Sequence, residues 1–99
     1  MAIVSLLDIP IKNLIDRLER MTGIRLPRRV ISISLNQKVL HIRFTYPKTM
    51  ETEVEPLPLK SLINLFRDEK TGEITAIEII DIEDTLTEIQ NHQSKKYIT

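Results

Sequence analysis

Five arginines in the first third of the chain are the residues best suited to binding chemistry. Arg17 and Arg20 are three residues apart in a helical pattern, so they share one helix face. Three more follow in a short basic linker. Guanidinium groups bind carboxylates and phosphates through paired hydrogen bonds. We therefore expect an anionic partner, either acidic protein groups or nucleic-acid phosphates, to contact Arg17, Arg20, Arg25, Arg28 and Arg29.

Charge is divided between the two halves of the chain, although the formal net charge is zero. Residues 1–50 carry nine Lys or Arg against three Asp or Glu, whereas residues 51–90 carry three against eleven. Such a division is expected when the halves pair within the fold or between subunits, or when the basic half binds nucleic acid. The balanced total favours pairing, with Asp16 and Glu19, with the acidic residues 51–55 or with a neighbouring subunit.

Ser32 and His41 are the pair that could serve nucleophilic hydrolysis, with Glu51, Glu53 or Glu55 as a third member. The strand register that we predict below places the two side by side on the outer face of a hairpin. A regular strand, however, commits its backbone N–H groups to the ladder and leaves no donors for an oxyanion. The pattern favours a plain polar sheet face, and we expect no catalytic residue.

Metal and cofactor sites are not predicted either. The chain has no cysteine, and its two histidines, His41 and His92, are far apart in sequence. The carboxylates of residues 81–84 fit the first turn of a helix better than a cation site. With only two glycines, the chain has no Gly-rich phosphate loop.

The elements that position these residues begin with a helix predicted over residues 9–22. Asp8 can cap it, Pro10 suits its first turn and Gly23 ends it. One apolar stripe at helical spacing predicts a core-facing side, with a dimer seam as the alternative. The stripe consists of Ile11, Leu14, Ile15, Leu18 and Met21.

A hairpin is predicted next, because apolar and polar residues alternate over residues 31–35 and 40–44. A tight turn at Asn36-Gln37 would set Ile33 opposite Leu40 and Ser32 opposite His41. An edge-like strand with one acidic face is expected at 50–55, then a helix or a strand at 59–67, a turn at 68–72 and a central strand at 73–81. The chain is expected to end with a short helix from 82 to about 90 and a frayed polar tail at 91–99. The fold class is α+β, a single domain over residues 1–99 with an N-terminal helix packed on an antiparallel sheet of four to five strands and a short C-terminal helix.

From Ser32 onward the chain resembles a family of very small bacterial and archaeal domains of unknown function. Residues 39–44, 51–54 and 68–80 are similar to its strand reading A-L-Y-I-R-L, its acidic T-E-E strand and its hairpin reading D-E-D-G-x-V-V-G-I-E-I-L. The resemblance covers about residues 32–84, with Lys38 and Ala76 where the family has Asp and Gly. It implies a strand at 61–67, and some members look like the antitoxin-type partner of a small toxin, which implies partner binding. The size and the Ile-rich, Cys-free composition also resemble small proteins of viruses of hyperthermophilic archaea.

Together these patterns predict a thermostable, non-enzymatic protein-interaction module that acts as a homodimer or as a partner-binding subunit. The alternative is non-specific nucleic-acid binding through the basic N-terminal half. No apolar run approaches the length that spans a bilayer, and no export signal is recognised, so we expect an intracellular protein without a membrane partner.

Overall fold

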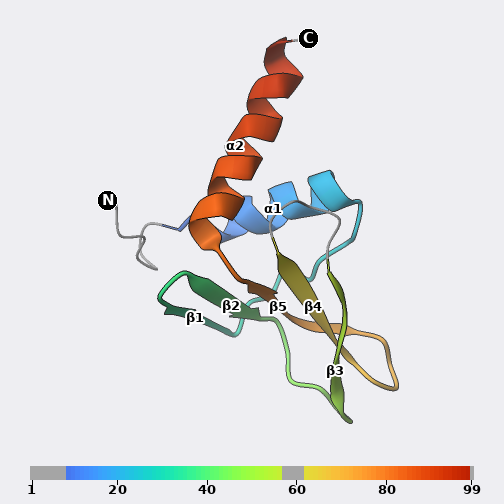
Figure 1. Cartoon of the computed structure of the whole chain (residues 1–99). Helices are drawn as coiled ribbons and strands as arrows, with labels where there is room; N and C mark the ends of the chain where they lie inside the picture. Colours follow the sequence, from blue (N-terminus) through green and yellow to red (C-terminus); the bar gives the residue numbers. More distant parts are fainter. Residues whose placement is uncertain (1–8, 57–61, 99) are drawn as a thin grey trace.

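The computed structural model describes residues 9–56 and 62–98 as two helices and one five-stranded sheet (Figure 1). The strands are antiparallel in the order β1-β2-β5-β4-β3, and both helices lie on the same side of the sheet. This arrangement confirms the predicted α+β class. In chain order the elements are α1 (Ile11–Thr22), β1 (Ser32–Asn36), β2 (Val39–Arg43), β3 (Glu51–Pro56), β4 (Ile63–Asp68), β5 (Ile74–Ile79) and α2 (Ile82–Ile98).

The core is aliphatic and lies between the two helices and the covered face of the sheet. Alternate residues of the three inner strands point into it because side chains along a strand alternate between faces. Helix α1 contributes the buried part of its apolar stripe, and α2 adds residues of its first turns. The buried side chains include Leu14, Ile15 and Leu18 of α1, Leu40 and Ile42 of β2, Ile63 and Leu65 of β4, Ile77 and Ile79 of β5, and Ile82 and Ile89 of α2.

Helix α1 begins two residues later than predicted, at Ile11. Pro10 occupies the N-cap position with no side-chain capping bond, so its placement in the first helical turn was wrong. The fixed φ of proline suits either position, which is why the pattern did not separate them. Asp8 lies outside the described residues. The predicted stop is confirmed, because Gly23 has a left-handed φ of 75° and donates its N–H to Glu19 O at 2.8 Å.

The β1–β2 hairpin is confirmed, but its predicted turn and register were wrong. Gln37 and Lys38 form the turn, and Leu35 lies opposite Leu40. Ser34, not Ser32, is therefore the residue opposite His41. The predicted register differs from the observed one by two residues, and such a shift leaves every side chain on its original face. Hydrophobic patterning alone could not distinguish the two.

Gln37 is the only residue other than glycine with a positive φ, 59°, within the described residues. An L-residue pays about 1 kcal/mol for this left-handed conformation, and glycine does not. We expect Gln37→Gly to raise the free energy of unfolding by about 0.5–1 kcal/mol in urea titrations. Glu69→Gly, in a turn where φ is not positive, should instead lower it. A destabilised Gln37→Gly protein would contradict this account of the turn.

The remaining elements largely match the sequence patterns. β3 lies at one edge, β5 is central and the ambiguous segment forms strand β4. The predicted end of the C-terminal helix near Gln90 was wrong, since α2 continues to Ile98. Residues 91–98 contain no Gly or Pro that would end it. Neither helix of the described residues has the length and apolar character needed to cross a lipid bilayer.

Candidate interaction surface

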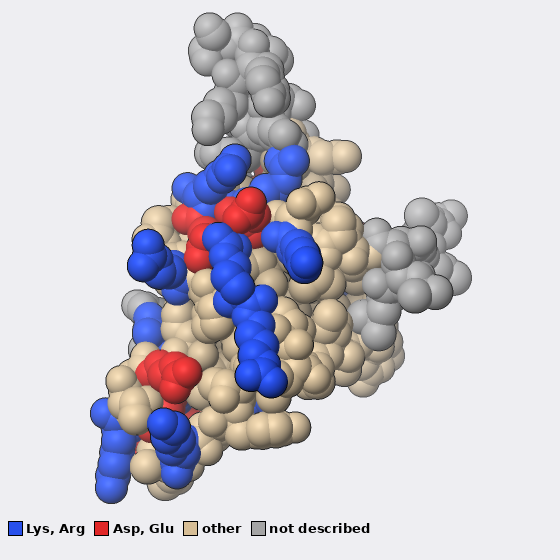
Figure 2. Space-filling model, turned by 180° about the vertical axis from the view of Figure 1, so that it is seen from behind, with Lys and Arg blue, Asp and Glu red and all other residues tan. Residues whose placement is uncertain are grey.

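The five predicted arginines lie on α1 and on the loop that leads from it to β1, but they do not form one cluster of free cations. Figure 2 shows Lys and Arg side chains around a small group of acidic ones on this side of the molecule. Arg28 Nη2 lies 2.6 Å from Glu19 Oε1 and 3.0 Å from Asp16 Oδ1. Arg20 Nη2 lies 4.0 Å from Asp16 Oδ2. Two of the five arginines are therefore paired with acids of α1 itself.

The other three arginines, Arg17, Arg25 and Arg29, make no ion pair with any residue that the structure describes. Arg25 and Arg29 are exposed, and Arg17 is half-buried. None of the five pairs with Glu51, which Arg43 holds instead. Among the five arginines, positive charge that no described residue pairs thus comes from three separate guanidinium groups.

Glu19 also fixes the loop that carries the basic residues. Its Oε2 accepts a hydrogen bond from the backbone N–H of Leu26 at 2.6 Å, while Oε1 accepts one from Arg28. The Leu26 side chain is buried in the core. One carboxylate therefore attaches the loop to α1 at two points and sets the path by which the chain enters β1.

The two edges of the sheet differ in the features that prevent further strand pairing. At the β3 edge the sequence has three glutamates and Pro56, and the strand carries a bulge between Glu53 and Glu55. Charges, proline and bulges are the usual means by which an edge strand is protected. β1 reads Ser-Ile-Ser-Leu-Asn, without charge, proline or bulge, and it pairs only with β2 among the described strands. The β1 edge can therefore accept another strand.

A groove of about 770 Å³ runs between α1 and β1, beside this open edge. Its apolar lining is formed by Ile11, Ile15, Val30 and Ile33, and its polar lining by Lys12, Asn13, Asp16 and Arg28. Ile33 is only partly buried, although it packs against the core. An apolar floor with charged groups at the rim is typical of a protein-binding groove.

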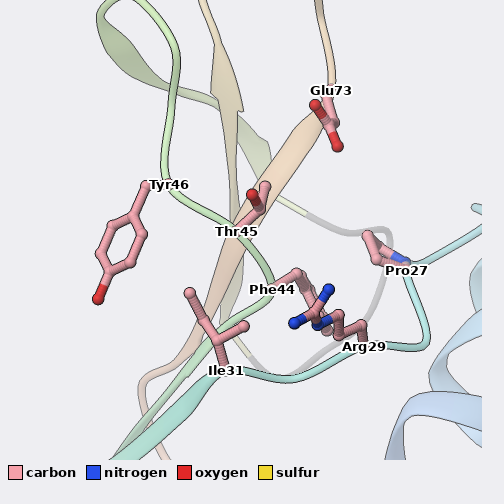
Figure 3. Close-up of a pocket in the computed structure, with 7 residues that line it drawn as sticks. All are labelled: Pro27, Arg29, Ile31, Phe44, Thr45, Tyr46 and Glu73. Atoms are coloured by element: carbon pink, nitrogen blue, oxygen red, sulfur yellow. The ribbon is translucent and has the colours of Figure 1, made fainter.

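A second hollow, of about 600 Å³, lies at the start of β1 (Figure 3). Arg29 and Ile31 come from the segment before β1, whereas Phe44, Thr45 and Tyr46 follow β2. Ile31 and Tyr46 are exposed, and the Arg43 guanidinium lies 5.6 Å from the centre of the Tyr46 ring. A lone tyrosine before a proline carries no pattern, so the sequence alone does not indicate a role for Tyr46. Tyrosine and arginine are frequent at binding hot spots.

The open face of the sheet carries a row of Ser34, His41 and Glu78 on three adjacent strands. His41 Nδ1 lies 3.8 Å from Glu78 Oε2, and the His41 ring centre is 6.1 Å from that of Phe66. The predicted pairing of Ser32 with His41 was wrong, since Ser32 lies opposite Arg43. His41 and Glu78 sit on the inner strands β2 and β5, whose backbone N–H groups serve the ladder, so these two positions offer no backbone donor for an oxyanion. Within the described residues, no group of His, Asp and Glu is arranged to hold a metal ion.

Arg43, Glu51 and Thr75 form a second polar group on this face. Arg43 donates two hydrogen bonds to Glu51, at 2.9 and 3.1 Å, and Thr75 Oγ1 donates a third. The bonds from Arg43 hold the pKa of Glu51 below its usual value against the effect of burial, and the same bonds raise the pKa of Arg43. These three side chains are hydrogen-bonded to one another. They therefore hold the two ends of the 44–50 loop together and do not form a ligand site.

No family model matches the chain, and neither a curated protein nor a solved structure is similar to it.

Proposed function

We propose that this protein is a non-enzymatic protein-interaction module that pairs the free edge of β1 with a strand of another protein chain, most simply in a homodimer. The contrast between the two sheet edges carries the proposal. An edge strand of five residues without charge, proline or bulge is an aggregation hazard unless another chain covers it. Strand addition at such an edge is a common mode of protein recognition.

The surroundings of β1 favour a protein over a nucleic acid. The adjacent groove has an apolar floor, which suits alternate side chains of an added strand, and the Arg28 guanidinium at its rim is already paired with acids. Asp16 and Glu19 stand among the arginines and would repel phosphates. Exposed Ile31 and Tyr46 lie at the start of the same strand and add apolar contact area.

Light scattering across a range of concentrations tests the proposal. We expect wild-type protein to reach twice the chain mass of 11.5 kDa. Ile33→Lys places a charge at the open edge and should weaken association at least about tenfold. Thr52→Lys is the matched control, because Thr52 is exposed on the β3 edge, and it should associate as wild type does.

Two results would contradict the proposal. One is a wild-type mass of one chain at every concentration. The other is equal association of Ile33→Lys and the wild type, with both folded by circular dichroism. A monomer that is retained on heparin at low salt, and loses retention in the double variant Arg25→Ala/Arg29→Ala, would favour the nucleic-acid alternative, which the three unpaired arginines support.

A further inference from the structure

The free edge of β1 is basic at one end and acidic at the other. Arg28 and Arg29 precede the strand, and Arg29 has no ion pair within the described residues. The opposite end is the β1–β2 turn, where the backbone N–H of Ile82 donates to Lys38 O at 2.9 Å. That bond places the acidic first turn of α2 beside the turn.

Carboxylates outnumber cations at the acidic end. Lys38 Nζ lies 4.0 Å from Asp81 Oδ2 and 3.6 Å from Glu83 Oε2, and Asp84 is exposed next to them. Among the described residues, one ammonium group thus lies beside two carboxylates, and a third follows them in sequence. An antiparallel partner with the same charge distribution would bring its basic end to this acidic end, whereas a parallel copy would set like charges together.

We infer that the strand added to β1 is β1 of a second copy, antiparallel, with Ser34 opposite Ser34 of the partner subunit. This inference rests on the proposed function and names the partner and the register. Residues directly opposite each other in an antiparallel pair share a face of the sheet, so only registers that pair odd with odd residues keep Ile33 and Leu35 on the α1 side. Among these, the register centred on Ser34 pairs all five residues of β1.

This register satisfies both faces of the new pair. On the α1 side, Ile33 lies opposite Leu35 of the partner subunit, so two half-buried apolar side chains cover each other. On the open face, Ser32 lies opposite Asn36 of the partner subunit, with no charge between them. Pairing of β3 with itself would instead set glutamates near glutamates. Self-association is therefore compatible with the β1 edge and not with the β3 edge.

The same register brings the charged ends together. Continued by one residue past β1, it sets Ile31 opposite Gln37 of the partner subunit, at the turn that carries Lys38, and the hydrogen bond from Ile31 N to Arg43 O shows that the chain still follows β2 there. Arg29 then approaches the carboxylates that surround the partner's Lys38. By two-fold symmetry each interface contains this contact twice.

A cysteine scan tests the register, because the chain has no cysteine of its own. Opposite residues of an antiparallel pair have Cα atoms about 4.5–5.5 Å apart, within the span of a disulfide. We expect Ser34→Cys to cross-link to itself under mild oxidation. Ser32→Cys and Asn36→Cys should each fail alone and cross-link when mixed. All three positions are exposed, so the substitutions leave the fold intact.

The outcomes separate this inference from the proposed function. A dimer by light scattering that cross-links through Ser34→Cys supports both. A dimer in which Ser34→Cys stays reduced, or in which Ser32→Cys or Asn36→Cys pairs with itself, overturns the inference and leaves the proposed function standing. A wild-type monomer at every concentration overturns both.

Charge reversal tests independently whether the basic end of one β1 strand lies beside the acidic end of the other. We expect Arg29→Glu to raise the dimer dissociation constant about tenfold at low salt. Mixing Arg29→Glu protein with Glu83→Arg protein gives one wild-type contact and one contact with its charges exchanged, so the heterodimer should be tighter than the Arg29→Glu homodimer. Equal affinity of the mixture and of that homodimer would contradict the antiparallel arrangement.

Discussion

Asp68→Asn lowers the melting temperature by about 10 °C or more, the largest loss of stability that we expect from a single polar substitution. The Asp68 side chain is only 2% exposed. Its Oδ1 accepts hydrogen bonds from Thr49 Oγ1 at 2.7 Å, Lys70 N at 3.0 Å and Thr71 N at 3.1 Å. Its Oδ2 accepts from the N–H groups of Lys48 and Thr49. One carboxylate thus joins the loop before β3 to the β4–β5 turn.

Asparagine has nearly the same shape as aspartate, but it has one acceptor oxygen instead of two and cannot make all of these bonds. Every partner of both oxygens is a donor, so the amide NH₂ faces N–H or O–H groups in either orientation. At least two donors then lose their acceptor in a buried place. Asp84→Asn is the control, because Asp84 is exposed, and it should change the melting temperature by no more than about 2 °C. Equal melting temperatures for the two variants would contradict this role of Asp68.

Asp68 also makes stability depend on pH in a stated direction. The hydrogen bond from Thr49 Oγ1, together with those from backbone N–H groups, holds the pKa of Asp68 well below its usual value, against the effect of burial. Its folded form therefore binds fewer protons than the unfolded chain in acid. The stabilisation is fully present above about pH 4, the unfolded value, and is lost as pH falls below it. Asp68→Asn should lack this part of the acid dependence in thermal melts from pH 7 to pH 2.

The sequence predicted the fold well where the pattern is local. Alternation identified β1, β2 and β3, and the alternating glutamates correctly indicated that β3 is an edge, whereas residues 59–67 were left open between a helix and a strand. The hairpin register could not be predicted from the sequence, because a shift of two residues satisfies the same alternation. The two registers differ in which residues form the turn, and the observed turn requires the positive φ of Gln37. The end of α2 was misplaced because a polar segment without Gly or Pro, such as residues 91–98, can form either a helix or an irregular tail.

The interaction surface was predictable only in part. The spacing of Asp16 and Glu19 among the arginines is visible in the sequence, and it corresponds to the observed pairing of Arg20 and Arg28. The partners of Asp68 lie some 20 residues earlier in the chain, at Lys48 and Thr49, and no local pattern indicates them. The open β1 edge needed the strand order, since the alternation of β1 is equally consistent with an inner strand.

Leu18→Ala tests whether burial of the apolar stripe is what holds α1 on the sheet, as the fold requires. The Leu18 side chain is fully buried, and α1 has no side-chain cap at its start. Truncation removes apolar contacts and leaves a cavity, for which we expect a loss of about 3 kcal/mol in the free energy of unfolding by urea titration. Lys12→Ala, on the exposed side of the same helix, should change it by no more than about 0.5 kcal/mol.

Hydrogen exchange distinguishes loosening of α1 from a uniform loss of stability. The amide of Leu26 is bonded to Glu19, so it reports on whether α1 and its loop open together. We expect Leu18→Ala to accelerate exchange of the Leu26 amide more than that of β5 amides at the centre of the sheet. Equal acceleration would mean that α1 opens only when the whole sheet unfolds, and a loss of stability below about 1 kcal/mol would mean that the stripe does not anchor the helix. Because α1 forms one wall of the groove beside β1, a helix that opens on its own would also expose the apolar floor beside the edge at which we propose that a strand is added.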